Sequence, residues 1–444
     1  MADSIERMER IIRDIEDDLI RTRRSIHRRP ETGWLEMRTS AIIHERLCAL
    51  GYEVLTGSRA VAPEARMGVP DPETLNRHAE EVMTQENTPL EYLTDEMKQG
   101  LTGVIGILER GPGPVVALRF DIDALGMVER NDDKHRPARE GFSSRNPGMM
   151  HACGHDAHVA IGLGTAAVLM GLKDQLHGTL KLIFQPAEEG ARGARAITAA
   201  GHLSDADYFI GSHVAPTDSL DDGDVTAGTW GSLATTKLDA VFTGMAAHAG
   251  GYPEKGRNAL LAAASAALAL HAIPRHSEGQ SRVNVGTLHA GTGRNVIPDQ
   301  AVMQLEVRGE TTEINQYMVR QAKNICRGTA EMQQCECEIR TVGEAEGQHS
   351  DLKLIQRIDE IVARDLPGLS LSTQQNARNW GSEDISIMMN EVQKHGGLAT
   401  YMRVMTPMAG AQHTASFDLD ERVIARSVRV FCAAVLDLMK GETK

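Results

Sequence analysis

Between residues 103 and 214, short and almost unbroken apolar stretches alternate with segments of helical character. The stretches read GVIGILE, VVALRFDID, GTLKLIFQPAEE and DYFIGSHV, and the helical segments span 157–172 and 191–200. Strands that are apolar along their whole length are typical of a sheet covered on both faces, and such sheets are largely parallel because the connecting helices cover them. We therefore expect an α/β domain with a mostly parallel sheet.

A different pattern occupies the middle of the chain. Strands at 235–244, 281–289, 301–309 and 335–342 and helices at 258–273 and 312–332 follow a β-α-β-β-α-β order, which predicts a ferredoxin-like α+β fold. Because 444 residues exceed what one core usually supports, we expect two domains. The first would comprise 1–228 and 345–444, with the polar segment 60–100 as a surface insertion, and the second would be an insert of 229–344.

The net charge and the distribution of the cysteines exclude several classes of protein. A formal net charge of −14 argues against nucleic acids and anionic membranes, which attract basic proteins. The longest apolar run, Ala259 to Ile273, is shorter than the ~18 residues of a membrane-spanning helix, and the charged N-terminus lacks a signal peptide's apolar core. The six cysteines are scattered, unlike a disulfide framework. We expect a cytoplasmic protein that acts on a small molecule.

The stretch GMMHACGHDAH, residues 148–158, concentrates histidines around one cysteine. Cys153 could be a nucleophile with a histidine base, because a helix start lowers the pKa of a thiol. It could also be a metal ligand together with His155, or a buried thiol without chemistry. His151 and His158 are expected to support the site or the fold instead of binding a metal.

Further polar side chains lie where predicted strands end, which is where open α/β sheets place ligands. Glu188 and Glu189 end one strand, His213 ends another, and His413 lies in the loop after the last strand. With the cysteine cluster they offer thiolate, carboxylate and imidazole donors for zinc, manganese or a related ion. A thiol enzyme does not need these additional ligand side chains, so the sequence favours a metal site over a nucleophilic cysteine.

The neighbouring carboxylates suggest two different roles, metal binding and proton transfer. Neighbouring residues at a strand end point different ways, so one of Glu188 and Glu189 can bind metal while the other moves protons. Asp121 and Asp123 share one face of a strand by their spacing and could orient ligand histidines.

Five motifs in this order resemble the M20 family of metallopeptidases and amidohydrolases, in the branch that cleaves N-acyl amino acids. They are GMMHACGHDAH, IFQPAEEG, SHV, GMAAHAG and GAQH. The resemblance covers almost the whole chain. It implies two divalent ions, manganese or zinc, held by a set of five ligands: Cys153, His155, Glu189, His213 and His413. Glu188 would be the general base and acid, and Cys153 would stand where other branches bridge the metals with aspartate.

The resemblance also assigns roles to the insert. It would be a lid and dimerisation domain whose His248 reaches the partner's site and steadies the oxyanion. Asn295, Arg294 and Arg308 would bind substrate, and Asp123 and Glu383 would support the metal ligands. The implied reaction is amide hydrolysis of an N-acyl amino acid, with glutamate favoured. Alternatives are a general aminoacylase, one half of a hetero-oligomer that is active only with a paralogous partner, and a paralogue that has lost its chemistry, against which the complete ligand set argues.

Overall fold

The computed structural model describes residues 2–217, 223–372, 376–378 and 381–440, which form two compact units. The first unit takes in residues up to 230, 349–378 and those from 387 onward, and the second takes in 231–348 and, among the described residues, 381–386. This differs from the expected insert of 229–344, since residues 381–386 join it through hydrogen bonds. Gly381 O accepts from Leu233 N at 3.1 Å, and Ser386 Oγ accepts from Glu346 N at 2.9 Å.

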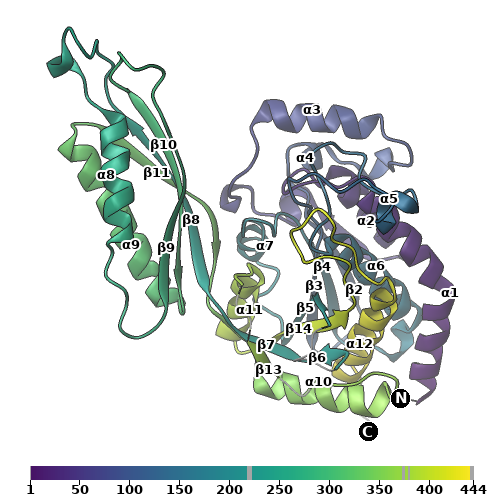
Figure 1. Ribbon diagram of the computed structural model, residues 1–444. Helices are drawn as coiled ribbons and strands as arrows, with labels where there is room; N and C mark the ends of the chain where they lie inside the picture. The colour runs from purple at the N-terminus through teal and green to yellow at the C-terminus, as the bar shows by residue number, and fades with distance from the viewer. Residues whose placement is uncertain (1, 218–222, 373–375, 379–380, 441–444) are drawn as a thin grey trace. The chain divides into compact units, whose positions relative to one another are not determined.

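The described part of the first unit is built on a seven-stranded sheet of order β1-β2-β4-β3-β5-β14-β6 (Figure 1). Strands β4, β3, β5 and β14 are parallel, and antiparallel strands extend the sheet at both edges. The mostly parallel sheet expected from the apolar stretches is therefore confirmed. The strands are β1 (Glu53–Thr56), β2 (Val104–Glu109), β3 (Val115–Asp121), β4 (Thr179–Gln185), β5 (Tyr208–Pro216), β6 (Val225–Thr226) and β14 (Leu398–Thr406).

Helices cover this sheet, and α1, α6 and α12 pack against one another. Helix α6 is buried over nearly its whole length. It approaches the sheet closely because Gly162 has no side chain, and a Cβ there would lie 2.5 Å from the ring of Phe184. The helices are α1 (Ala2–His27), α2 (Met37–Leu50), α3 (Pro72–Met83), α4 (Asp95–Lys98), α5 (Arg136–Arg139), α6 (His155–Gly171), α7 (Ala194–Ala199), α10 (Leu352–Asp365), α11 (Ile385–Lys394) and α12 (Arg422–Leu438).

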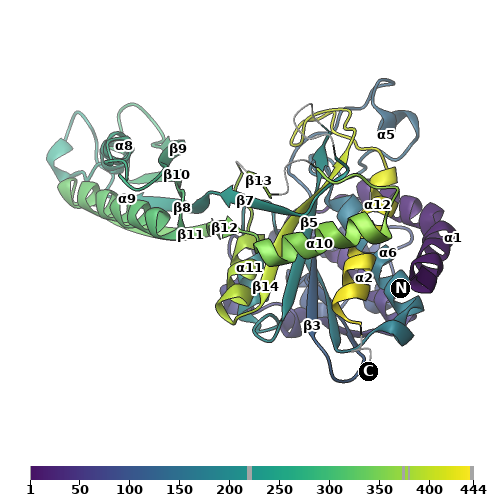
Figure 2. The same cartoon turned by 90° about the horizontal axis from the view of Figure 1, so that it is seen from below.

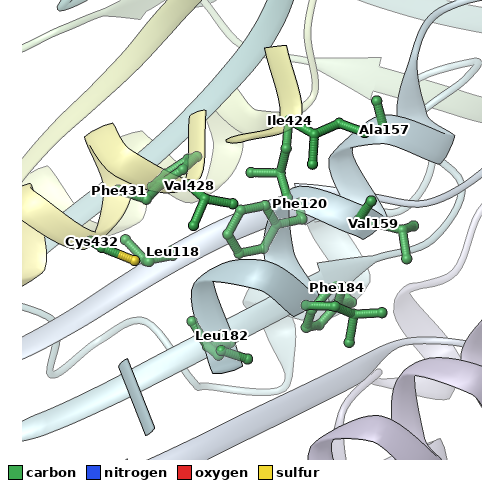
Figure 3. Close-up of a cluster of buried hydrophobic side chains, with 14 of the residues drawn as sticks. Leu118, Phe120, Ala157, Val159, Leu182, Phe184, Ile424, Val428, Phe431 and Cys432 are labelled. Atoms are coloured by element: carbon green, nitrogen blue, oxygen red, sulfur yellow. The ribbon is translucent and has the colours of Figure 1, made fainter. Parts of the chain in front are cut away.

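Phe120 lies at the centre of the apolar core between the sheet and α12 (Figure 3). Its ring centroid is 5.4 Å from that of Phe184 on β4 and 5.1 Å from that of Phe431 on α12. Both neighbours are fully buried, so they contribute close to the full stabilisation of an aromatic side chain. This packing fixes the ends of β3 and β4, from which the site residues project.

Residues 60–100 form a partly helical segment on the first unit, with α3 and α4 joined by irregular chain. Helix α3 begins at Pro72 because Asp71 accepts a hydrogen bond from Thr74 N at 2.9 Å and proline suits the first helical position. Trp34 Nε1 donates to Met67 O at 2.7 Å and ties the segment to the chain before α2.

The second unit has the expected β-α-β-β-α-β order, and its antiparallel sheet has the strand order β11-β8-β10-β9 (Figure 2). Helices α8 and α9 pack together and onto the sheet around a core of small and apolar side chains. This confirms the ferredoxin-like fold. The elements are β8 (Ala234–Thr243), α8 (Ala259–His271), β9 (Ser281–Ala290), β10 (Gln300–Gly309), α9 (Thr312–Met332) and β11 (Glu336–Ala345).

Three short strands, β7 (Gly228–Ser232), β12 (Gln348–His349) and β13 (Asn376–Arg378), form a third small sheet of order β12-β7-β13. Over the described residues, no helix combines the length and the apolar character needed to span a bilayer.

Candidate metal centre and catalytic site

The structure brings Cys153, His155 and Glu189 together, with one ligand atom of each within 4.8 Å of the others. Cys153 and His155 flank Gly154, which caps the N-terminus of α6 with a φ of 100°. A Cβ at Gly154 would lie 2.6 Å from Val214 Cγ2, so only glycine fits this conformation and this space. The predicted convergence of these three residues is therefore present in the geometry.

Backbone carbonyls orient the histidines. His155 Nδ1 lies 2.9 Å from Asp123 O and His213 Nδ1 lies 2.6 Å from Val214 O. Because a carbonyl oxygen can only accept, both Nδ1 atoms carry a proton, which leaves Nε2 as the ring nitrogen that can bind a metal ion. His155 Nε2 is buried, His155 and Cys153 have ligand atoms within 4.8 Å of each other, and His213 Nε2 lies 3.4 Å from Cys153 Sγ. Two imidazoles held in this way beside a thiol fit a metal ion.

The pKa shifts of His213 and His155 also agree with a metal site. Burial and the neighbouring His158 hold the pKa of His213 well below its ordinary value, so its ring is neutral. Burial alone would lower the pKa of His155, but Asp121 and Cys153 raise it well above its usual range. Surroundings that favour a proton on His155 also favour a metal cation there.

The two glutamates lie in a tight turn after β4. Ala187 and Ala191, on either side of the pair, have φ values of 52° and 59°, a conformation that costs energy for residues other than glycine. Glu189 N donates to Asp123 Oδ2 at 2.9 Å, which fixes the turn against the end of β3. Glu188 is 8% exposed, so its carboxylate lies in a largely desolvated place beside a metal ligand candidate.

His413 lies in the loop after β14, with a φ of 61°. Its backbone N donates to Ala152 O at 2.8 Å, which ties the loop to the residue before Cys153. Its Nε2 is 3.4 Å from Glu189 Oε1, and its side chain is 54% exposed. The structure thus places the fifth predicted ligand beside the third, at the solvent side of the site.

Asp121 and His158 complete a second group around His155 and His213, again with ligand atoms within 4.8 Å. His158 Nε2 accepts a hydrogen bond from Val214 N at 3.1 Å, so its Nδ1 carries the proton and donates to Asp121. Both nitrogens of His158 are therefore used, which agrees with the supporting role expected from the sequence. Burial alone would raise the pKa of Asp121, but its neighbours, with Arg119 contributing most, hold it well below its usual range.

Glu36 was not recognised from the sequence. It is fully buried, its Oε1 accepts from Ala187 N at 2.8 Å, and its Oε2 accepts from Thr102 Oγ1 at 2.6 Å. Burial, with help from Asp123, raises the pKa of Glu36 to about 8. Glu36 supports the turn that carries Glu188, and nothing in its sequence neighbourhood marks it, because the contact arises only in the fold.

In the second unit, His248 Nδ1 accepts hydrogen bonds from Gly250 N at 3.1 Å and Gly251 N at 2.9 Å. Two backbone donors on Nδ1 leave the proton on Nε2, so the ring presents a donor. Ala249 N donates to Asn295 O at 3.0 Å, which brings the loop of Asn295 beside that of His248.

The remaining candidates differ in their surroundings. Arg308 lies 2.9 Å from Glu306 Oε1 and 3.3 Å from Ser382 Oγ, so its charge already has a carboxylate partner. Arg294 is exposed. Glu383, expected near the metal ligands, belongs to the second unit, where its carbonyl accepts from Ser386 Oγ at 2.8 Å.

Comparison with known proteins decides the family. The profile described as peptidase family M20/M25/M40 matches residues 117–437. The chain belongs to this family. An indole-3-acetyl-aspartic acid hydrolase of Enterobacter agglomerans is 47% identical to it over 427 residues, covering 96% of this chain and 97% of that protein. The A subunit of the p-aminobenzoyl-glutamate hydrolase of Escherichia coli is 43% identical over 434 residues and is covered to 98%, as is this chain.

The similarity to a solved structure extends from the sequence to the fold. The crystal structure of the aminobenzoyl-glutamate utilization protein from Klebsiella pneumoniae superposes with a TM-score of 0.83 at 40% identity, covering 97% of this chain and 98% of that one. The resemblance to the A subunit of p-aminobenzoyl-glutamate hydrolase, which residues 58–71, 281–299 and 381–389 suggested, is confirmed over nearly the full length of the chain. M20 enzymes are metal-dependent hydrolases of amide bonds, and the donors around His155 fit that chemistry.

Proposed function

We propose that this M20 protein hydrolyses the amide bond between an acyl group and an acidic amino acid. The convergence of Cys153, His155 and Glu189, with Glu188 beside them, carries the proposal. The relatives named for indole-3-acetyl-aspartic acid and p-aminobenzoyl-glutamate both act on conjugates that end in an acidic amino acid. p-Aminobenzoyl-glutamate is our first candidate substrate, which would place the chain in folate catabolism, and indole-3-acetyl-aspartate is the second.

The proposed metal centre holds two divalent ions, manganese or zinc, through the thiolate, the carboxylate and the three imidazoles predicted as ligands. Cys153 would contribute an anionic sulfur within reach of both ions. When bound, such ions polarise a carbonyl and lower the pKa of water.

Glu188 then carries the proton. It accepts the proton that the attacking water loses, and it returns that proton to the amine nitrogen as the C–N bond breaks. Its near-complete burial keeps bulk water from competing for the proton. The carbonyl oxygen becomes an oxyanion during the attack, and the Nε2–H of His248, supplied by a second copy of the chain, donates a hydrogen bond to it.

The partner in this proposal is a second copy bound through the lid, or a paralogous B subunit. Strand β9 forms an edge of its sheet, and α8 exposes Leu261 to 47% and Leu268 to 80%. An open strand edge beside exposed leucines favours association. Light scattering of the purified chain, with and without the paralogous partner, distinguishes the two. All six cysteines are free, in keeping with a reducing cytoplasm.

The decisive experiment combines metal analysis with a panel of conjugates: p-aminobenzoyl-glutamate, indole-3-acetyl-aspartate, hippurate and an acyl-leucine. We expect bound manganese or zinc and hydrolysis of the two acidic conjugates. Cleavage of hippurate or acyl-leucine alone would make the chain a general aminoacylase. Activity that appears only with the paralogous partner would establish the hetero-oligomer. No hydrolysis in either preparation would refute the proposal.

A cysteine nucleophile is tested in the same preparation. Cys153→Ser should release metal, because the hydroxyl is a weaker ligand than a thiolate. If Cys153→Ser abolished turnover while the metal stayed at full occupancy, the nucleophile would be the better explanation.

A further inference from the structure

Arg192 is a half-buried cation whose side-chain hydrogen bonds to the described residues go to carbonyl oxygens and not to carboxylates. Its Nε donates to Glu189 O at 3.0 Å and its Nη1 donates to Gly68 O at 3.1 Å. A guanidinium has five N–H donors, and these two bonds leave both N–H groups of Nη2 and one of Nη1 without a partner there. The edge formed by Nη1 and Nη2 can offer one N–H from each nitrogen to the two oxygens of a carboxylate.

Several other arginines packed into the first unit are neutralised by the protein itself, whereas the hydrogen bonds of the Arg38 and Arg66 guanidinium groups, like those of Arg192, go to uncharged oxygens. Arg23, Arg119, Arg136 and Arg357 each lie within 3 Å of a carboxylate oxygen. Removing a cation from water without an anion beside it costs free energy, and the chain has anions in excess, with a net charge of −14. Arg192 differs from Arg38 and Arg66 because it bonds to the backbone of Glu189, a candidate metal ligand, so a ligand bound at that site can supply its counter-ion.

The chain makes room for this guanidinium. A Cβ on Gly33 would lie 2.3 Å from Arg192 Nη2 and 3.0 Å from Ala187 Cβ, so a larger residue at position 33 would displace the side chain. Gly190 and Ala191, with φ values of 94° and 59°, turn the chain so that Arg192 folds back over the carbonyl of Glu189. Three segments therefore fix the position of the Arg192 guanidinium: the α1–α2 connection through Gly33, the 60–100 segment through Gly68, and the turn that carries Glu189.

We propose that Arg192 binds the side-chain carboxylate of the acidic amino acid in the substrate. The proposal rests on the function proposed above and names the residue that selects its substrate. Glu189 is a candidate metal ligand through its side chain and holds Arg192 through its carbonyl, so the cation lies next to the reacting centre. In glutamate, the side-chain carboxylate carbon lies about 5 Å from the amide nitrogen, since four bonds of about 1.5 Å separate them. To bind a glutamate conjugate, the fork of Arg192 would have to reach a carboxylate at about that distance from the scissile bond.

The test compares N-acyl-glutamate with N-acyl-glutamine, which share their shape and differ in the charge of the side chain. We expect the wild-type chain to prefer the glutamate conjugate in kcat/KM. Arg192→Gln should lower the glutamate-to-glutamine ratio by about 10- to 100-fold, the usual size of a charge-assisted hydrogen bond. The loss should fall mainly on the KM of the glutamate conjugate. Arg192→Lys should retain part of the preference, because it keeps the charge without the fork.

Two measurements separate binding from damage to the fold. Titration calorimetry of the product should show weaker binding of glutamate to Arg192→Gln, with little change for glutamine. Gly33→Ala should shift the same ratio in the same direction by displacing the guanidinium. The control is Arg59→Gln, which removes an exposed arginine that lies 3.2 Å from Glu53 and should leave the ratio unchanged.

The outcomes also separate this inference from the proposed function. An unchanged ratio in Arg192→Gln, or an equal loss on both conjugates, would overturn the role of Arg192. A wild-type chain that cleaves both conjugates equally well would overturn it too, while leaving the amidohydrolase function in place. A wild-type chain that binds metal and cleaves neither conjugate would refute the function itself.

Discussion

Replacing Arg23 with methionine should lower the free energy of unfolding by about 3–5 kcal/mol, the cost of removing one partner from a buried ion pair. The Arg23 side chain on α1 is fully buried and lies 2.7 Å from Asp156, 3.0 Å from Asp418 and 3.3 Å from Glu421. Arg136 still neutralises Asp418 at 2.6 Å. The charge that loses its arginine is therefore chiefly Asp156, which follows the candidate ligand His155 and is itself fully buried.

Urea unfolding followed by far-UV circular dichroism measures this change. Arg24→Met is the matched control, because Arg24 is the next residue on α1, pairs with Glu421 at 2.6 Å and has a side chain that is 30% exposed. Glu421 keeps Arg23 and Arg136 as partners in this variant, so the loss should stay near the ~1 kcal/mol of a partly exposed pair. Adding Asp156→Asn to Arg23→Met should recover part of the loss, because it removes the uncompensated charge. A loss no larger than that of Arg24→Met, or no recovery in the double variant, would refute the reasoning.

Three further predictions test the site and its surroundings. Glu188→Gln should keep its metal content and lower kcat by about 100-fold or more, the usual contribution of a general acid–base group; steady-state kinetics with metal analysis checks this, and full activity would refute the assigned role. Gly154→Ala should weaken metal binding in calorimetric titrations and cost about 1–3 kcal/mol of stability, because its φ is 100° and the added Cβ would meet Val214 at 2.6 Å; an unchanged metal titration would contradict it. Burial alone would lower the pKa of His27, but hydrogen bonds to two buried carboxylates raise it above its ordinary value. Its stabilisation is therefore complete below about pH 6.5, the unfolded pKa, and is lost as the pH rises through the folded pKa; His27→Gln should remove this dependence from urea titrations run across pH, and an unaltered dependence would count against it.

The sequence predicted the elements that have a strong period or strong end signals. Helix α9 has the expected bounds of 312–332, because Thr311 caps it by accepting from Ile314 N and its apolar residues recur at helical spacing. The parallel strands were recognisable by their continuous apolar character. Glu189, which follows β4, could be grouped with Cys153 and His155 at the start of α6, because open α/β sheets place ligands where their strands end.

Contacts between distant segments could not be predicted in the same way. Glu36 supports the glutamate turn from the start of α2, and no local pattern connects it with Ala187. The assignment of residues 381–386 to the second unit depends on single hydrogen bonds such as that of Gly381 with Leu233. Arg192 gave no signal either, because the absence of a counter-ion is a property of the folded surroundings and not of the residues beside it in the chain.

The ion pairs of Arg23 also have a consequence for the order in which the protein can mature. Residues 231–348 of the second unit lie between Arg23 and its partners Asp418 and Glu421 in the chain, so translation completes them before it reaches those two anions. Domains fold as their residues emerge, so the ferredoxin-like unit can form on the ribosome while Arg23 still lacks two of its three anions. His413 arrives in the same late segment. The proposed ligand set of the nascent chain therefore stays incomplete until translation has passed residue 413.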